Sequence, residues 1–129
     1  MSDRRLTLLV ADDYPENRQL FSLYLRKEYD VVTAASGEEV VARLREAPVA
    51  AALLDLNYQG GMTGFDILEH IRATPALADL PTMALTAHAS PEDRDECLAA
   101  GFDAYLSKPV MKTEMLEAVR SLLDVRASA

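Results

Sequence analysis

Hydrophobic and polar positions along this chain form two kinds of pattern. One is a short apolar run, and the other is a longer stretch in which apolar residues recur with a helical period. The apolar runs predict five strands, at 6–11, 31–34, 49–54, 82–85 and 104–106. The longer stretches predict five helices, at about 15–28, 36–47, 65–73, 90–100 and 113–125. Short strands that alternate with helices are typical of a parallel sheet covered on both faces. We therefore expect one doubly wound α/β domain over 1–129, with a core of about 5–125.

Local signals support several of these helix ends. Ser36 followed by Glu39 predicts a capping box, and Ser90 before Pro91 predicts a second capped helix start. Gly101 is typical of a helix C-cap. The single cysteine, Cys97, falls within a helical pattern, and we interpret it as a packing residue.

Polar residues stand where four of the apolar runs end. Asp12 and Asp13 follow the first run, Asp55 the third, Thr86 the fourth, and Lys108 the fifth. If these runs are neighbouring parallel strands, their carboxyl ends lie along one edge and these side chains converge on one crevice. Each residue alone could be a turn or a cap, so the prediction depends on their joint arrangement.

Such a crevice has a definite chemistry. Carboxylates about 4 Å apart repel by several kcal/mol at an effective dielectric constant of about 20. The crevice therefore needs a bound cation or protons to offset this repulsion. A hard divalent ion such as Mg²⁺ prefers oxygen ligands, and a carboxylate beside it can act as a nucleophile and form aspartyl phosphate. The Lys108 ammonium and the Thr86 hydroxyl could then bind phosphoryl oxygens.

Composition narrows the class of protein. The chain has 129 residues, is 50% hydrophobic and carries a formal net charge of -8, which fits one soluble globular domain. Its longest apolar run, 49–54, is too short for a membrane span, and Asp12 interrupts the first run before it could act as a signal peptide, so we expect no membrane and a cytoplasmic location. The acidic balance and scattered basic residues argue against nucleic acid as a partner.

Four short motifs together make a recognisable combination: Val-Ala-Asp-Asp at 10–13, Leu-Leu-Asp-Leu at 53–56, Leu-Thr-Ala at 85–87 and Tyr-Leu-Ser-Lys-Pro at 105–109. With them the chain resembles, over essentially its whole length, the response-regulator receiver domains of two-component signalling. The resemblance implies a flavodoxin-like, doubly wound sheet of five strands in the order 2-1-3-4-5, with five helices.

The resemblance also implies a role for each site residue. Asp55 would accept a phosphoryl group from the phosphohistidine of a histidine kinase or histidine phosphotransfer domain. Asp12, Asp13, Asp55 and the backbone carbonyl of Asn57 would hold Mg²⁺, directly or through water. Lys108 would pair with the acceptor or its phosphoryl group.

The implied switch is a movement of Thr86 toward the phosphoryl group while Tyr105 swings inward. The face of the fourth helix, fifth strand and fifth helix would then change its contacts with a downstream protein target, and the same face is a candidate homodimer surface. Pro109 is a candidate cis-proline. The protein would catalyse only its own phosphorylation and dephosphorylation.

One loop departs from the family pattern. Receivers usually carry Met-Pro after the acceptor, whereas residues 57–64 lack the proline, are one residue longer, and contain Tyr58, Gly60 and Gly61. We predict a more flexible loop and an altered Mg²⁺ affinity or phosphoryl lifetime.

Three alternatives remain. A haloacid-dehalogenase-type phosphatase would need a second Asp two positions after its nucleophilic Asp, and Asn57 stands at that position after Asp55. An FMN protein would need a Ser/Thr/Gly-rich loop at 12–15. A phosphorylation-independent docking module remains the main rival, although every acidic and Lys position is present.

The route of the outgoing signal is a separate question. No output domain follows residue 125, so we expect the signal to leave by protein contact, from a stand-alone regulator or a hybrid-kinase receiver. The first helix near Asn17, with Val110 and Met111 exposed, is the expected docking surface for the phosphoryl donor.

Overall fold

The fold is a five-stranded parallel sheet in the order β2-β1-β3-β4-β5, as predicted. The computed structural model describes residues 5–58, 61–87 and 90–127. The strands are β1 (Thr7–Ala11), β2 (Asp30–Ala34), β3 (Ala51–Asp55), β4 (Thr82–Thr86) and β5 (Ala104–Ser107). The helices are α1 (Pro15–Leu25), α2 (Gly37–Glu46), α3 (Gly64–Ala73), the short 3-10 helix η1 (Pro75–Leu77), α4 (Pro91–Ala100) and α5 (Lys112–Ala127).

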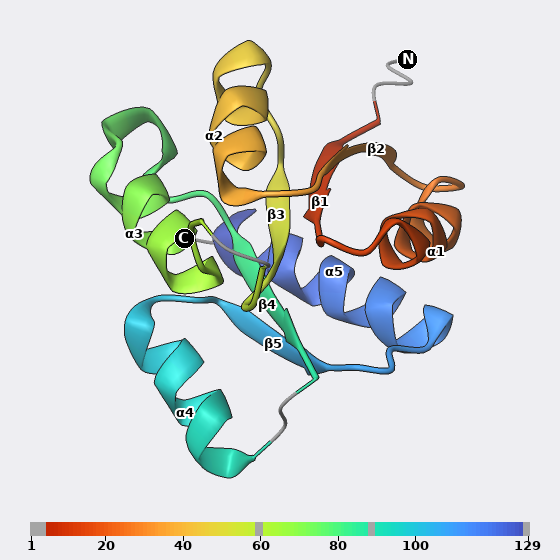
Figure 1. Ribbon diagram of the computed structural model, residues 1–129. Helices are drawn as coiled ribbons and strands as arrows, with labels where there is room; N and C mark the ends of the chain where they lie inside the picture. The colour runs from red at the N-terminus through yellow and green to blue at the C-terminus, as the bar shows by residue number, and fades with distance from the viewer. Residues whose placement is uncertain (1–4, 59–60, 88–89, 128–129) are drawn as a thin grey trace.

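Helices cover both faces of the sheet: α1 and α5 lie on one side, and α2, α3 and α4 on the other (Figure 1). The alternation of side chains along a strand explains how one apolar run serves both layers. In β3, Ala52 and Leu54 pack toward α2 and α3, while Ala51 and Leu53 pack toward α1 and α5. Every residue of β3 is buried, which accounts for the continuous apolar run in the sequence.

The register of the strands aligns their carboxyl ends. Ala11 pairs with Leu54, and Asp55 pairs with Leu85 one step further along. The polar residues that end or follow β1, β3, β4 and β5 therefore share one edge of the sheet, as the sequence predicted. Among the described residues, no helix is long and apolar enough to cross a membrane.

Several element boundaries differ from the sequence-based expectations. Asp55 and Thr86 are the last residues of their strands rather than the first residues after them, because both extend the parallel pairing by one position. Helix α1 ends at Leu25, three residues earlier than expected.

The predicted capping box forms only in part at α2. Ser36 accepts a hydrogen bond from the Glu39 backbone N–H, but the Glu39 carboxylate accepts from Ala35 rather than from Ser36 itself. A reciprocal capping box occurs instead at α3, between Thr63 and Asp66. The apolar pattern predicted that this helix starts at Phe65, one residue late, and therefore did not predict the capping box.

The expected exposure of Val110 is wrong. Val110 is 4% exposed because it packs into the core under α1 and α5, whereas Met111 is 68% exposed. Cys97 is buried, as predicted for a packing residue. Gly101 ends α4 with a φ of +120°, a conformation that side chains rarely adopt. In the unusual loop, Gln59 and Gly60 lie outside the described residues.

Candidate functional site

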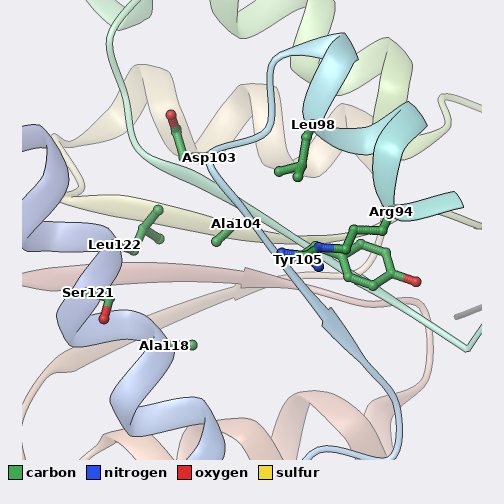
Figure 2. Close-up of a pocket in the computed structure, with 8 residues that line it drawn as sticks. All are labelled: Arg94, Leu98, Asp103, Ala104, Tyr105, Ala118, Ser121 and Leu122. Carbon is green, nitrogen blue, oxygen red and sulfur yellow. The ribbon is translucent and has the colours of Figure 1, made fainter. Parts of the chain in front are cut away.

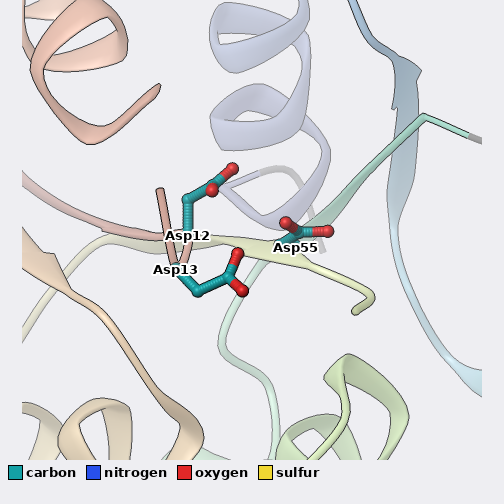
Figure 3. A group of neighbouring side chains, drawn as sticks. All are labelled: Asp12, Asp13 and Asp55. Carbon is teal, nitrogen blue, oxygen red and sulfur yellow. The ribbon is translucent and has the colours of Figure 1, made fainter. Parts of the chain in front are cut away.

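Three carboxylates meet at the carboxyl edge of the sheet. Asp12 and Asp13 follow β1, Asp55 ends β3, and one oxygen of each lies within 4.8 Å of the others (Figure 3). Asp12 and Asp55 are buried and Asp13 is half-buried. Parallel pairing of β1 with β3 brings these side chains together across more than forty residues of sequence, which is how two separate motifs become one site.

Asp12 is fixed by its neighbours on α1. One carboxylate oxygen accepts from the Tyr14 backbone N–H at 2.9 Å, and the other accepts from the Asn17 side-chain amide at 3.2 Å. The Arg18 guanidinium donates to the backbone carbonyl of Asp12 at 2.7 Å. Sequence reasoning placed Asn17 on a docking surface and gave Arg18 no role. The signal that could have identified them is their position in the first turns of the helix that follows the acidic pair.

Lys108 joins two of the three carboxylates. Its Nζ donates to Asp12 at 2.7 Å and to Asp55 at 3.0 Å. Burial works to lower the pKa of Lys108, but the hydrogen bonds and charges of Asp12 and Asp55 outweigh it and raise that pKa above its ordinary value. The Lys108–Pro109 peptide bond is cis.

Asp55 has an environment that disfavours its charge. Burial raises the pKa of this carboxyl group, while the Asn57 backbone N–H at 3.1 Å and the Lys108 ammonium act against the rise. The charge of Asp12 adds to it. A carboxylate that is costly to keep charged gains from any further cation brought into the site.

A cavity of about 250 Å³ opens beside Asp13 and Asp55 of this cluster. It is lined by Asp13, Tyr14, Asp55, Asn57, Tyr58, Ala87 and Lys108. The Tyr58 ring also packs against the apolar core on the other side, and its hydroxyl donates to the Ala11 carbonyl at 3.4 Å. Burial, followed by the nearby charges of Asp55 and Asp12, raises the pKa of Tyr58 well above its usual range, so its hydroxyl remains a donor at ordinary pH.

Two other candidate residues line different cavities. Thr86 is buried at the end of β4 and faces a neighbouring cavity of about 290 Å³, which Asn57 also lines. Tyr105 is half-buried on β5, in a pocket between α4 and α5 (Figure 2). Its hydroxyl points away from the α5 side chains of that pocket. The structure thus gathers the carboxylates and Lys108 in one cluster, and places Thr86 and Tyr105 in two other cavities.

The donor set suits a hard divalent cation. All three clustered groups offer carboxylate oxygens, and they outnumber the single Lys108 ammonium, which contacts Asp12 and Asp55. Oxygen-rich, negatively charged and partly open sites are the kind that Mg²⁺ occupies while it keeps some of its waters. The arrangement could therefore hold a divalent cation beside a carboxylate that borders a cavity.

Comparison with known proteins identifies the family of this chain. Residues 8–120 match the family described as the response regulator receiver domain. This chain belongs to the receiver domain family. As a receiver domain it is a signalling module, with the phosphoacceptor role of two-component signalling. Its relatives include an uncharacterized 14.6 kDa protein of Leptolyngbya boryana, 34% identical over 90% of this chain and 88% of that protein.

Other relatives are much longer proteins. The sensory/regulatory protein RpfC of Xanthomonas campestris is 33% identical over 92% of this chain, but the match spans 17% of RpfC. A probable transcriptional regulatory protein, TcrX of Mycobacterium tuberculosis, is 34% identical over 92% of this chain and 50% of its own length. The receiver domain therefore occurs both in proteins of this size and within larger ones.

Solved receiver structures have the same fold. The chemotaxis protein CheY4 of Vibrio cholerae superposes with a TM-score of 0.86, at 30% identity over 92% of this chain and 99% of CheY4. The receiver domain of the sensor histidine kinase PA1611 of Pseudomonas aeruginosa gives a TM-score of 0.84, at 29% identity over 94% of this chain and 99% of that domain. The latter structure is described with a magnesium ion coordinated in its active-site cleft.

Proposed function

We propose that Asp55 is the phosphoacceptor and takes its phosphoryl group from a phosphohistidine of a histidine kinase or histidine phosphotransfer domain. The observation that carries the proposal is the joint placement of Asp55 with two further carboxylates and the Lys108 ammonium at the carboxyl edge of the sheet. Asp55 also borders the cavity of about 250 Å³ through which a donor group could approach it.

The transfer is a substitution at phosphorus. A bond forms between an Asp55 carboxylate oxygen and phosphorus while the N–P bond of the phosphohistidine breaks, and the departing imidazole takes up a proton. The Lys108 ammonium, 3.0 Å from Asp55, is placed to bind a phosphoryl oxygen and to stabilise the added negative charge. Hydrolysis of the aspartyl phosphate by water restores the carboxylate and releases phosphate. The domain catalyses these steps only on itself.

The residues proposed to hold Mg²⁺ are Asp12, Asp13, Asp55 and the backbone carbonyl of Asn57. Three of them are the clustered carboxylates, and the fourth lies in the loop that follows Asp55 and borders the same cavity. When bound, the ion supplies charge neutralisation for the carboxylates and for the phosphoryl oxygens. The hydrogen bonds from Tyr14 and Asn17 orient Asp12 for this task.

Thr86 and Tyr105 are proposed to transmit the change. Phosphorylation adds charge and acceptor oxygens at Asp55, so a conformation that brings the Thr86 hydroxyl to the phosphoryl group gains free energy. Movement of Thr86 would alter the space beside it, which is lined by Asp93 and Glu96 of α4, and Tyr105 would move inward. The surface of α4, β5 and α5 is then the face that a downstream protein, or a second copy of the chain, would distinguish.

The proposed docking surface for the phosphoryl donor lies beside the cluster. Leu20 and Phe21 of α1 border an apolar cavity of about 310 Å³ together with Pro109, Val110 and Lys108. Leu20 is exposed, as are Leu23 of the same helix and Met111, which follows Val110 in the chain. An apolar surface next to the acceptor is suited to a helix of the donor protein.

Phosphorylation with acetyl phosphate tests the acceptor assignment. We expect intact-mass analysis to show one added phosphoryl group in the presence of Mg²⁺, and none after chelation or in Asp55→Asn. Asp103→Asn is the matched control, because it makes the same change in a carboxylate that lies outside the cluster. Modification of Asp55→Asn to the wild-type extent would contradict the assignment.

The alternative is a receiver that acts only by docking, without phosphorylation. NMR spectra recorded with beryllofluoride and Mg²⁺, a stable mimic of the phosphoryl group, separate the two. Shifts that spread from Asp55 to Thr86 and Tyr105 are expected for the phosphorylated switch. A spectrum identical to that of the untreated protein favours the docking module.

A further inference from the structure

The loop that follows the acceptor contains an aromatic residue with contacts in two directions. The ring of Tyr58 lines the acceptor cavity on one side and packs against the apolar core on the other. We propose that Tyr58 is a positioning residue: its hydroxyl holds the loop that carries the Asn57 carbonyl against the end of β1. This inference rests on the proposed metal and phosphoryl site.

The hydroxyl contact joins the two halves of the site. Tyr58 lies three residues after Asp55, and its hydroxyl donates to the carbonyl of Ala11 at 3.4 Å. Ala11 is the last residue of β1 and directly precedes Asp12. The contact therefore links the segment that contributes Asp55 and Asn57 to the segment that contributes the other two carboxylates. At 3.4 Å it is a long hydrogen bond, so the effect expected from its loss is moderate.

The far end of the same loop is held by backbone and side-chain packing. Gly64 donates its N–H to the Leu56 carbonyl at 3.0 Å, and a Cβ placed on Gly64 would lie 2.5 Å from the Asp55 carbonyl oxygen. Met62 packs closely on α2, because a Cβ placed on Gly37 would lie 2.5 Å from the Cβ of Met62. The distal half of the loop is thus fixed by these contacts, and Tyr58 supplies an anchor for the proximal half.

The anchor matters because the loop sequence itself imposes little rigidity. The sequence between Asn57 and Gly64 contains two consecutive glycines and no proline. The Asn57 backbone carbonyl, one residue before Tyr58, must stay close to the carboxylates if it is to bind the same ion. Holding a ligand in place before the ion arrives reduces the conformational entropy lost on binding. The hydrogen bond of Tyr58 to Ala11 is therefore proposed to keep the neighbouring Asn57 carbonyl in place.

Tyr58→Phe removes only the hydroxyl and keeps the ring. Tyr24→Phe is the matched control, since the Tyr24 hydroxyl also donates to a backbone carbonyl, that of Val110, at the shorter distance of 3.0 Å. Mg²⁺ affinity is measured by NMR titration of each protein, and amide hydrogen exchange at Asn57 is measured without metal. The rate of phosphorylation by acetyl phosphate is then followed as a function of Mg²⁺ concentration.

We expect Tyr58→Phe to bind Mg²⁺ about twofold to fivefold more weakly, as for loss of a modest hydrogen bond, and to exchange its Asn57 amide faster. Its phosphorylation rate should return to the wild-type value at saturating Mg²⁺, because the residue positions a ligand and does not touch the reacting atoms. Tyr24→Phe should match wild type in all three. Wild-type affinity and exchange in Tyr58→Phe would overturn the inference alone, whereas a wild-type protein that is never phosphorylated would overturn the proposed function.

Discussion

Two clusters of charged side chains lie at opposite edges of the sheet, and they differ in how their charges are balanced. The amino-edge cluster consists of Arg72, Thr82 and Asp103, near the starts of β4 and β5. The carboxyl-edge cluster consists of Asp12, Asp13, Asp55 and Lys108. Each pairs a basic side chain with carboxylates, yet only one has the composition of a reactive site.

The charges of the amino-edge cluster are balanced. One Arg72 guanidinium nitrogen donates to the Asp103 carboxylate at 3.1 Å and to the Thr82 hydroxyl at 2.9 Å. The same group also donates to the backbone carbonyls of Ala78, Leu80 and Gly101. Asp103 accepts in addition from the Thr82 backbone N–H at 2.9 Å. One positive and one negative charge satisfy each other, so this cluster fastens α3 to the starts of two strands.

The carboxyl-edge cluster leaves negative charge in excess. Lys108 contacts two carboxylates, and a third lies within 4.8 Å of both. Burial raises the pKa of Asp55 in spite of its hydrogen bonds. A cluster that is unbalanced in this way gains free energy from a cation, and the cavity of about 250 Å³ gives a cation access to Asp13 and Asp55. Charge balance therefore separates the chemical site from the structural one more clearly than residue type does.

The largest effect is expected from breaking the balanced cluster. Arg72→Met removes the positive charge that pairs with Asp103 and the donor to three carbonyls, and should lower the free energy of unfolding by about 3 kcal/mol. Arg72→Lys should recover only part of this, because an ammonium cannot reproduce the planar set of donors. Urea unfolding of the three proteins measures the differences, and a loss below about 1 kcal/mol in Arg72→Met would count against the closed network.

The same substitution should have opposite signs at the two edges. Asp103→Asn should lower the free energy of unfolding by about 2 kcal/mol, since it weakens hydrogen bonds to a charged partner. Asp55→Asn should raise it at neutral pH without Mg²⁺, because it removes a buried charge that the fold disfavours. Chemical denaturation in the presence of a chelator compares them. Destabilisation by both substitutions would remove the proposed contrast.

Mg²⁺ should stabilise the protein through the carboxyl-edge cluster alone. At a metal concentration ten times the dissociation constant, the free energy of unfolding should rise by about 1.4 kcal/mol. Asp103→Asn should gain the same increment as wild type although its metal-free stability is lower, and Asp13→Asn should gain a smaller increment. Thermal melts with and without the ion measure this, and an equal gain in Asp13→Asn would exclude that carboxylate as a ligand.

The smallest effect is a pH dependence that follows from Asp55. A carboxyl group whose pKa is raised by folding stabilises the protein most below its ordinary value of 3.8, and that contribution is lost as the pH rises through the raised pKa. The advantage of Asp55→Asn over metal-free wild type should therefore be absent in acid and grow toward neutral pH. Denaturation curves across this range would show it, and a constant difference would assign the effect to another cause.

The sequence was sufficient for the sheet order and for the convergence of the strand-end residues. The convergence follows from apolar runs of strand length and from the rule that parallel strands end at one edge, whereas the strand order was implied by the resemblance to receiver domains. The amino-edge cluster was not predicted, because Arg72 and Asp103 carry no local pattern and meet only through the packing of α3 on the sheet. Val110 was misplaced for a similar reason, since a residue between a proline and a helix start can pack inward without any periodic signal.

The support around the candidate site was also hidden from the sequence. Asn17 and Arg18 hold Asp12 through contacts of α1 with the end of β1, and the polar pattern of that helix did not predict either contact. Tyr58 was noted only as a large ring near the site. Its hydrogen bond to Ala11 depends on the three-dimensional course of the loop.

The most direct test of the account is to locate the phosphoryl group chemically. Borohydride reduces an aspartyl phosphate to homoserine, so protein treated with acetyl phosphate and Mg²⁺ can be reduced, digested and sequenced by mass spectrometry. We expect homoserine at position 55, dependent on Mg²⁺, in wild type and in Asp103→Asn. Homoserine at Asp12 or Asp13 instead, or no reducible group under conditions where the protein is folded and binds Mg²⁺, would contradict Asp55 as the acceptor.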